Sequence, residues 1–144
     1  MVYILMICMV VPLLLLIPML EKQSRLLLGF VLGGMVLAVC AYEINSVVCA
    51  LFSLSGPELS ITAAPIVEEI LKALPVLFFA LLVSDDRKLV LQLAMASGIG
   101  FAILENAFLL ITYVDQVDIA WAVVRGISTS LSHGICTMIV GNGI

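Results

Sequence analysis

The chain has 144 residues, of which 64% are hydrophobic and only 11% are charged, and its formal net charge is −4. A soluble domain is about half apolar and about a quarter charged, so this composition excludes an ordinary soluble domain and predicts a protein that crosses a membrane several times. The acidic balance, with no basic patch, excludes nucleic acid as a partner.

We predict an all-α, polytopic transmembrane helical bundle that forms a single domain over residues 1–144. Five apolar segments are separated by short polar loops, and each is long enough to cross the roughly 30 Å core of a lipid bilayer as a helix. The predicted spans are about 1–20, 26–52, 61–83, 89–112 and 119–140. The first lacks a basic n-region and an A-x-A-like cleavage site, so we interpret it as a retained span rather than a signal peptide.

The loops between these spans differ in charge. The loops after the first and third spans contain basic residues, whereas the loops after the second and fourth contain only acids as charged residues. The positive-inside rule therefore predicts that the first and third loops are cytoplasmic and that the amino terminus lies outside. The second loop, Ser55 to Glu58, has the Gly-Pro composition of a turn.

The third span carries three charged side chains within five residues: Glu68, Glu69 and Lys72. A charged side chain at the centre of a membrane helix costs about 2.5–3.5 kcal/mol on the lenient scales, so three of them need a compensating reason. Lys72 follows Glu68 at i+4 and Glu69 at i+3, and it can meet either on one helix face. One glutamate is left unpaired, and we predict that this span supplies half of a polar site.

The fourth span combines a small-residue face with a buried acid. Ala94, Gly98 and Ala102 recur every four residues, which predicts close approach of a neighbouring helix. Glu105 and Asn106 follow, and a lone carboxylate in lipid needs a partner.

The fifth span carries one polar face, on which Arg125, Thr129, His133 and Thr137 recur every four residues. His133 is the only histidine in the chain. At 1.5 Å per residue, Glu68, Glu69 and Glu105 lie about 11 Å below the predicted outer helix ends, and Arg125 lies about 9 Å below. His133 is the exception, at about 20 Å. We predict one polar level in the outer half of the membrane.

The charges of this cluster nearly cancel, because three glutamates face Lys72 and Arg125. A proton on His133 or on one glutamate would neutralise the remainder, as would a divalent metal that carries hydroxide. The chemistry that fits is hydrolysis, in which a glutamate takes a proton from water while His133 or Arg125 stabilises the oxyanion. Alternatively, Glu68, Glu105 and His133 would hold zinc with an open position for water.

Three motifs resemble the PrsW family of intramembrane proteases, which is related to the CAAX prenyl endopeptidases and the bacteriocin-processing proteins. They are Glu-Glu-Ile-Leu-Lys at 68–72, Gly-Ile-Gly-Phe-Ala-Ile-Leu-Glu-Asn at 98–106, and Arg125 followed by His133. They occur in order on separate spans, and the resemblance covers roughly residues 60–143. It implies proteolysis of a membrane-anchored protein or peptide by a multi-pass protein in the plasma membrane of a prokaryote.

Carried over by motif, the resemblance implies that Glu68 is the catalytic base, that Glu105 is its partner and that His133 helps to hold the oxyanion. Glu69 completes the catalytic set, and the expected supporting residues are Lys72, Asn106, Arg125 and Thr137. Glu105 stands where the related endopeptidases have a histidine, and Thr137 where they have an asparagine, so Arg125 or Thr137 would donate to the oxyanion. Whether a metal or a glutamate activates the water stays open.

Family members usually have more spans than five, and this chain stops just after Gly-Asn-Gly at 141–143, so we expect it to be truncated at its carboxyl end. Two other classes of function stay compatible with the sequence. Clusters of Glu, Arg and His within membranes also mark proton relays, as in a proton- or ion-coupled transporter, although we see no internal repeat. The third alternative is a catalytically silent membrane scaffold.

Overall fold

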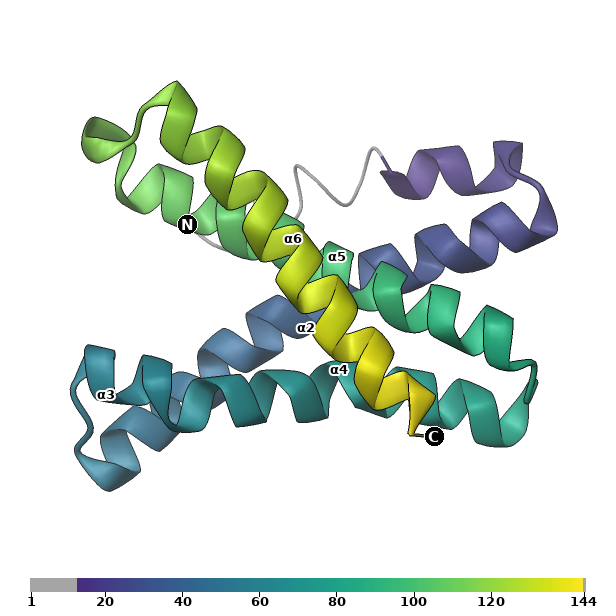
Figure 1. The fold of residues 1–144 in the computed structure, drawn as a ribbon, viewed down its shortest axis with the longest axis horizontal. Helices are drawn as coiled ribbons and strands as arrows, with labels where there is room; N and C mark the ends of the chain where they lie inside the picture. Colours follow the sequence, from purple (N-terminus) through teal and green to yellow (C-terminus); the bar gives the residue numbers. More distant parts are fainter. Residues whose placement is uncertain (1–12, 144) are drawn as a thin grey trace.

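A computed structural model describes residues 13–143 of the chain. The described part is a bundle of helices without a strand, which confirms the all-α prediction (Figure 1). Its elements are η1 (Ile17–Met19), α2 (Lys22–Phe52), α3 (Gly56–Ile61), α4 (Ala63–Leu82), α5 (Arg87–Thr112), η2 (Val114–Gln116) and α6 (Ile119–Asn142). Most of the predicted span over residues 1–20 lies outside the described residues.

The described residues contain three helices that are long and apolar enough to cross a membrane, namely α2, α5 and α6. Helix α4 has 20 residues but carries Glu68, Glu69 and Lys72. It does not meet the same limit on charge, so the predicted number of five spans is approximate. The helices that do meet the limit place the chain in the membrane.

Residues 56–61 form a short helix, and the predicted turn at this place is therefore wrong. The cause is a capping box: the Ser55 hydroxyl accepts from the Glu58 backbone N–H, and the Glu58 carboxylate accepts from the Ser55 backbone N–H at 2.8 Å. Pro57 in the first turn favours the same conformation. Helix α2 begins four residues before the predicted span because Lys22, Gln23 and Arg25 are good helix formers. It ends where Ser53 adopts a left-handed conformation, with φ of 51°.

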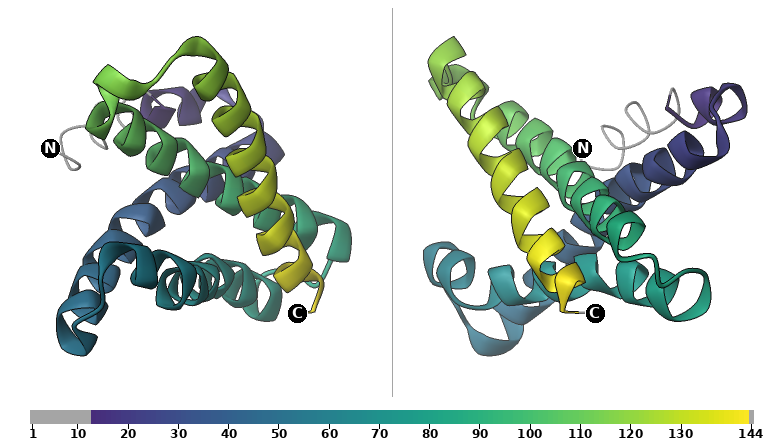
Figure 2. Two further views of the ribbon diagram at one scale, coloured as in Figure 1. Left: turned by 60° about the vertical axis from the view of Figure 1, so that its left-hand side comes forward. Right: turned by 45° about the vertical axis from the view of Figure 1, so that its right-hand side comes forward.

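Helix α5 is the centre of the described bundle. Ten of its residues are buried, against three of α6, so α5 forms the core that the other helices cover. Its most extensive contacts are with α2 and α6, which lie on different sides of it (Figure 2). Helix α4 packs on α2, α5 and α6 together.

Three glycines let α5 meet its neighbours backbone to backbone. A methyl group at Gly98 would collide with the backbone of His133 on α6, and one at Gly100 would collide with the backbone of Val31 on α2. Gly34 of α2 faces the backbone of Ser97 in the same way. The small-residue face predicted on α5 thus lies at the crossing with α6, through Gly98, whereas the close contact with α2 uses Gly100, which is not part of that face.

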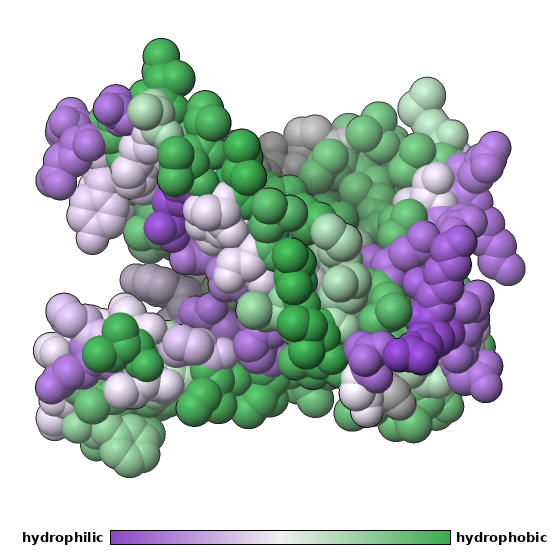
Figure 3. Space-filling view, in the orientation of Figure 1, coloured by the Kyte–Doolittle hydropathy of each residue, from purple (hydrophilic) through white to green (hydrophobic). Residues whose placement is uncertain are grey.

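The two ends of the molecule differ. At one end the start of α2, the loop between α4 and α5 and the end of α6 come together, and this is where hydrophilic side chains cover the right-hand side of Figure 3. At the other end the tip formed by η2 diverges from the tip formed by α3. The surface between these two tips is hollowed and lined partly by hydrophilic residues (Figure 3).

Candidate active site

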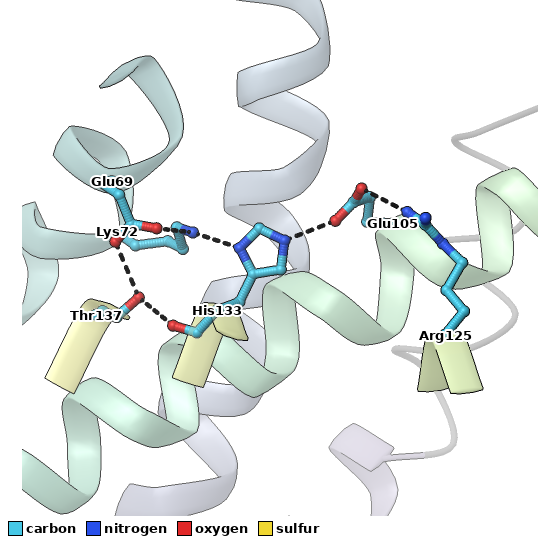
Figure 4. Close-up of polar contacts among 6 residues, drawn as sticks. All are labelled: Glu69, Lys72, Glu105, Arg125, His133 and Thr137. Carbon is cyan, nitrogen blue, oxygen red and sulfur yellow. Dashed lines mark hydrogen bonds and ion pairs between the residues drawn. The ribbon is translucent and has the colours of Figure 1, made fainter. Parts of the chain in front are cut away.

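Lys72 lies at the centre of the site. Its side chain is fully buried, and its ammonium donates to Glu69 Oε1 at 2.5 Å. The ammonium also lies 2.7 Å from His133 Nδ1 (Figure 4). It is 4.6 Å from the centre of the Phe101 ring. The pairing that the sequence left open is thus between Lys72 and Glu69.

The contacts of His133 define its tautomer. A lysine ammonium has only donors, so His133 Nδ1 must accept from Lys72. The ring proton is then on Nε2, which lies 2.8 Å from Glu105 Oε2 and donates to that carboxylate. His133 thus connects the Glu69–Lys72 ion pair of α4 to the Glu105 carboxylate of α5.

Glu105 is held from two sides. Its second oxygen, Oε1, accepts from the Arg125 guanidinium at 3.0 Å. Arg125 in turn lies 5.7 Å from the Trp121 ring, in the first turn of α6. The polar chain therefore runs from Glu69 through Lys72, His133 and Glu105 to Arg125, and it draws on three helices (Figure 4).

Helix direction explains why His133 reaches Glu105 although the two residues were predicted at different depths. Side chains in an α-helix lean toward the amino terminus of the helix. Helix α5 runs opposite to α4 and α6 (Figure 1). The Glu105 side chain therefore points toward the helix crossing, and the side chains of His133 and Lys72 point toward Glu105. The lean of each side chain shortens the gap that the helix rise alone would leave.

Thr137 lies one turn beyond His133 and is fully buried. Its hydroxyl is 2.8 Å from the His133 carbonyl oxygen and 3.4 Å from Glu69 Oε2. A hydroxyl has one proton to donate, and the His133 carbonyl oxygen is the nearer of the two acceptors. Thr137 therefore supports the turn that carries His133 and lies beside Glu69.

Glu68 faces a groove instead of a partner. Within residues 13–143 it makes no hydrogen bond and no ion pair. The groove has a volume of about 240 Å³ and lies between α2, α3, α4 and α5. Its walls include Tyr42, Asn45, Ala64, Glu68, Phe101, Glu105 and Phe108. The groove is thus lined by Glu68, which has no partner in the described part, and by Glu105, which is held by Arg125 and His133.

Asn45 is a groove residue that the sequence analysis missed. It lines the groove with both acids, and its Oδ1 atom is buried without a hydrogen-bond partner. The signal was an asparagine in an otherwise apolar stretch of α2, which by itself is also typical of a helix end near the membrane interface. Asn106, which was predicted to support the site, instead lines a separate pocket with Arg125 and Trp121.

The residues expected to hold a metal do not fit one in this arrangement. His133 has no free lone pair, because Nδ1 accepts from Lys72 and Nε2 carries the proton given to Glu105. The described residues contain no group of three or more His, Cys, Asp or Glu side chains that is placed to bind a metal ion. We therefore derive no catalytic step through a metal.

Charged residues inside a membrane bundle that pair with one another are typical of a functional site. The comparisons give the family. Residues 22–144 match the family model described as PrsW family intramembrane metalloprotease, and the chain belongs to this family. It is therefore an integral membrane peptidase, and the resemblance inferred from the three motifs is confirmed. No curated protein and no solved structure matches the chain.

Proposed function

We propose that this protein cleaves a peptide bond of a membrane-anchored protein in the groove between α2, α3, α4 and α5, with Glu68 as the general base. One observation carries this assignment. Glu69 and Glu105 are each held by a cation, whereas Glu68 has no such partner in the described part and lines the groove. A carboxylate has about four lone-pair sites, and Glu68 is the one of these three acids that keeps all of them free to accept from water in the described part.

The reaction follows from general acid–base chemistry. Glu68 takes a proton from a water molecule, and the oxygen of that water attacks the carbonyl carbon of the scissile peptide bond. The carbonyl oxygen becomes an oxyanion, and protonated Glu68 then returns its proton to the leaving amine as the C–N bond breaks. All atoms and charges are conserved, and the products are a carboxylic acid and an amine.

The other residues position this chemistry. Arg125 and His133 fix the orientation of Glu105, so that its carboxylate stands in the groove at a defined place beside the water. Lys72 holds the His133 ring from behind. We assign Glu69 to this supporting set as the counter-ion of Lys72 and not as a second base. Asn45 lines the groove with a side-chain amide, and we assign it as a donor to the oxyanion.

We place the groove toward the outer face of a prokaryotic plasma membrane. The support is the position of the basic residues: Lys22, Arg25, Arg87 and Lys88 lie at the opposite end of the molecule, and basic residues favour the cytoplasmic side. A substrate anchored in the outer leaflet would then enter between the tips of α3 and η2.

Zinc stays a separate proposal that the family description supports. In the present arrangement His133 would first have to leave Lys72 or give up its proton to Glu105. Metal analysis of the purified protein, together with a chelator test of its activity, decides this point.

The test of the function is cleavage by the purified protein in liposomes that contain a membrane-anchored substrate. We expect Glu68→Gln to lower turnover by about 10²–10⁴-fold, the range of general base catalysis, with unchanged helix content. Proton flux measured in the same liposomes tests the transporter alternative, which the continuous polar chain also suggests. Proton flux without cleavage would replace the protease assignment with that of a transporter.

A further inference from the structure

A second cavity lies at the basic end of the molecule, away from the polar site. It is formed where the first turns of α2, the end of α4 and the first turns of α5 meet, and its volume is about 890 Å³. Lys22, Arg25 and Lys88 line it together with one acid, Asp86. Hydrophilic surface is continuous over this end of the molecule (Figure 3).

The cavity carries a net positive charge, and most of this charge is not paired within the protein. The Asp86 carboxylate accepts from the backbone N–H groups of Lys88 at 3.0 Å and Leu89 at 3.4 Å, so its Oδ1 serves as the cap of α5. Lys22 and Lys88 make no ion pair within residues 13–143. The cavity therefore offers two ammonium groups without a counter-ion.

The third cation is held in a fixed orientation. The Arg25 guanidinium donates to the carbonyl oxygens of Leu20, at 2.5 Å, and Pro18, at 3.1 Å. These two bonds use Nε and one terminal nitrogen, which leaves further N–H donors of the same guanidinium free. A guanidinium fixed in this way is suited to a phosphate group, which it can contact through more than one donor.

Part of the cavity wall is apolar. Leu26, Phe79, Val83 and Leu89 line this part, and Val83 is 65% exposed. A free phosphate or a soluble sugar phosphate would leave this wall uncovered. A ligand with an anionic head and a hydrocarbon tail would contact both the cations and the apolar residues of the cavity.

We propose that this cavity binds an anionic phospholipid. The phosphate lies between Lys22, Arg25 and Lys88, and the first part of an acyl chain lies along the apolar wall. Basic pockets between membrane helices on the cytoplasmic side are suited to anionic head groups. Because the lipid contacts α2, α4 and α5 at once, it stabilises the assembly of these three helices.

The experiment is native mass spectrometry of the purified full chain in a neutral detergent, titrated with phosphatidylglycerol or with phosphatidylcholine of the same acyl chains. We expect one phosphatidylglycerol to be retained with at least tenfold preference. Each cation near a phosphate contributes about a fivefold factor, so Lys88→Gln lowers the affinity about fivefold. The combined change of Lys22, Arg25 and Lys88 to Gln lowers it about 100-fold.

Arg87→Gln is the matched control, because it removes the same charge from the neighbouring residue. Arg87 lies outside the cavity and donates to Asn142 Oδ1 at the end of α6, so its change leaves lipid affinity as it was. The proposal is overturned by equal retention of the two lipids, by an equal effect of Arg87→Gln and Lys88→Gln, or by displacement of the lipid with equimolar inorganic phosphate. None of these outcomes depends on proteolytic activity.

Discussion

The helix crossing around α5 and the groove beside it share α2 and α5 but are opposite in character. At the crossing, Gly98 and Gly100 bring backbones into direct contact, and the surrounding side chains are buried. In the groove, Glu68 has no partner in the described part, and the Oδ1 atom of Asn45 is buried without one. A rigid support beside unsatisfied polar groups is what a binding or catalytic site requires. In the proposed mechanism the crossing supplies the positional accuracy and the groove supplies the chemistry.

His133 joins the two regions, because its backbone lies at the crossing and its ring lies in the polar chain. His133→Ala removes the donor to Glu105 and the acceptor for Lys72. We expect turnover in liposomes to fall by about 10²–10⁴-fold. Ser132→Ala, at the exposed neighbouring position, is the control and should keep native turnover. Near-native cleavage by a folded His133→Ala variant would separate the polar chain from the chemistry.

A substitution at Asn45 tests the role of the groove. Asn45→Leu removes the proposed donor to the oxyanion, and kcat should fall by about 10²–10³-fold, the loss seen when one such donor is removed. The same change eliminates a buried polar atom that lacks a partner, so the Tm should stay the same or rise. A purely structural role predicts the reverse, with a lower Tm and an unchanged kcat in the protein that remains folded.

A substitution at Gly98 tests the tight packing at the helix crossing. Gly98→Ala places a methyl group against the backbone of His133, and we expect a loss of about 1–3 kcal/mol in the free energy of unfolding. Gly126 on α6 has open space around its Cα, so Gly126→Ala should stabilise the protein by up to about 1 kcal/mol through helix propensity. Thermal unfolding of both variants in one detergent makes the comparison. Equal effects of the two changes would show that the crossing is not tight.

Some of the contacts in the site could be predicted from the sequence, and others could not. The meeting of Glu105, Lys72 and His133 was predictable, because charged side chains in an apolar helix need partners. The spacing could not decide between Glu68 and Glu69 as the partner of Lys72, since both lie on its helix face. Which glutamate pairs with Lys72 depends on how α4 is rotated about its own axis relative to α6.

The remaining differences have local causes. A Gly-Pro pair is typical of a turn, and it takes the reciprocal hydrogen bonds of Ser55 and Glu58 to convert it into α3. Asn45 escaped notice because its neighbours in the groove come from α4 and α5, far along the chain. Contacts of that kind depend on how helices cross, which periodicity does not specify.

The smallest expected effect concerns α3, which contributes to the groove wall. The backbone N–H and then the hydroxyl of Ser55 hold the pKa of Glu58 below its ordinary value of 4.5. A lowered pKa in the folded state means that the carboxylate stabilises the cap above about pH 4.5, and that this contribution is lost as the pH falls through the lower, folded-state pKa. Amide exchange over residues 56–61, corrected for its intrinsic pH dependence, should rise in that acidic range. Glu58→Gln should remove this dependence, and if it persists the cap is not the cause.

The most direct test of the account compares two neighbouring acids, Glu68 and Glu69, in single-turnover cleavage of a membrane-anchored substrate. We predict that Glu68→Gln lowers the rate by about 10²–10⁴-fold with little change in Tm. Glu69→Gln should lower the rate much less and should reduce the Tm, because Glu69 is the counter-ion of Lys72. If Glu69→Gln abolishes cleavage while Glu68→Gln cleaves at a near-native rate, the assignment of the unpaired acid as the base is contradicted.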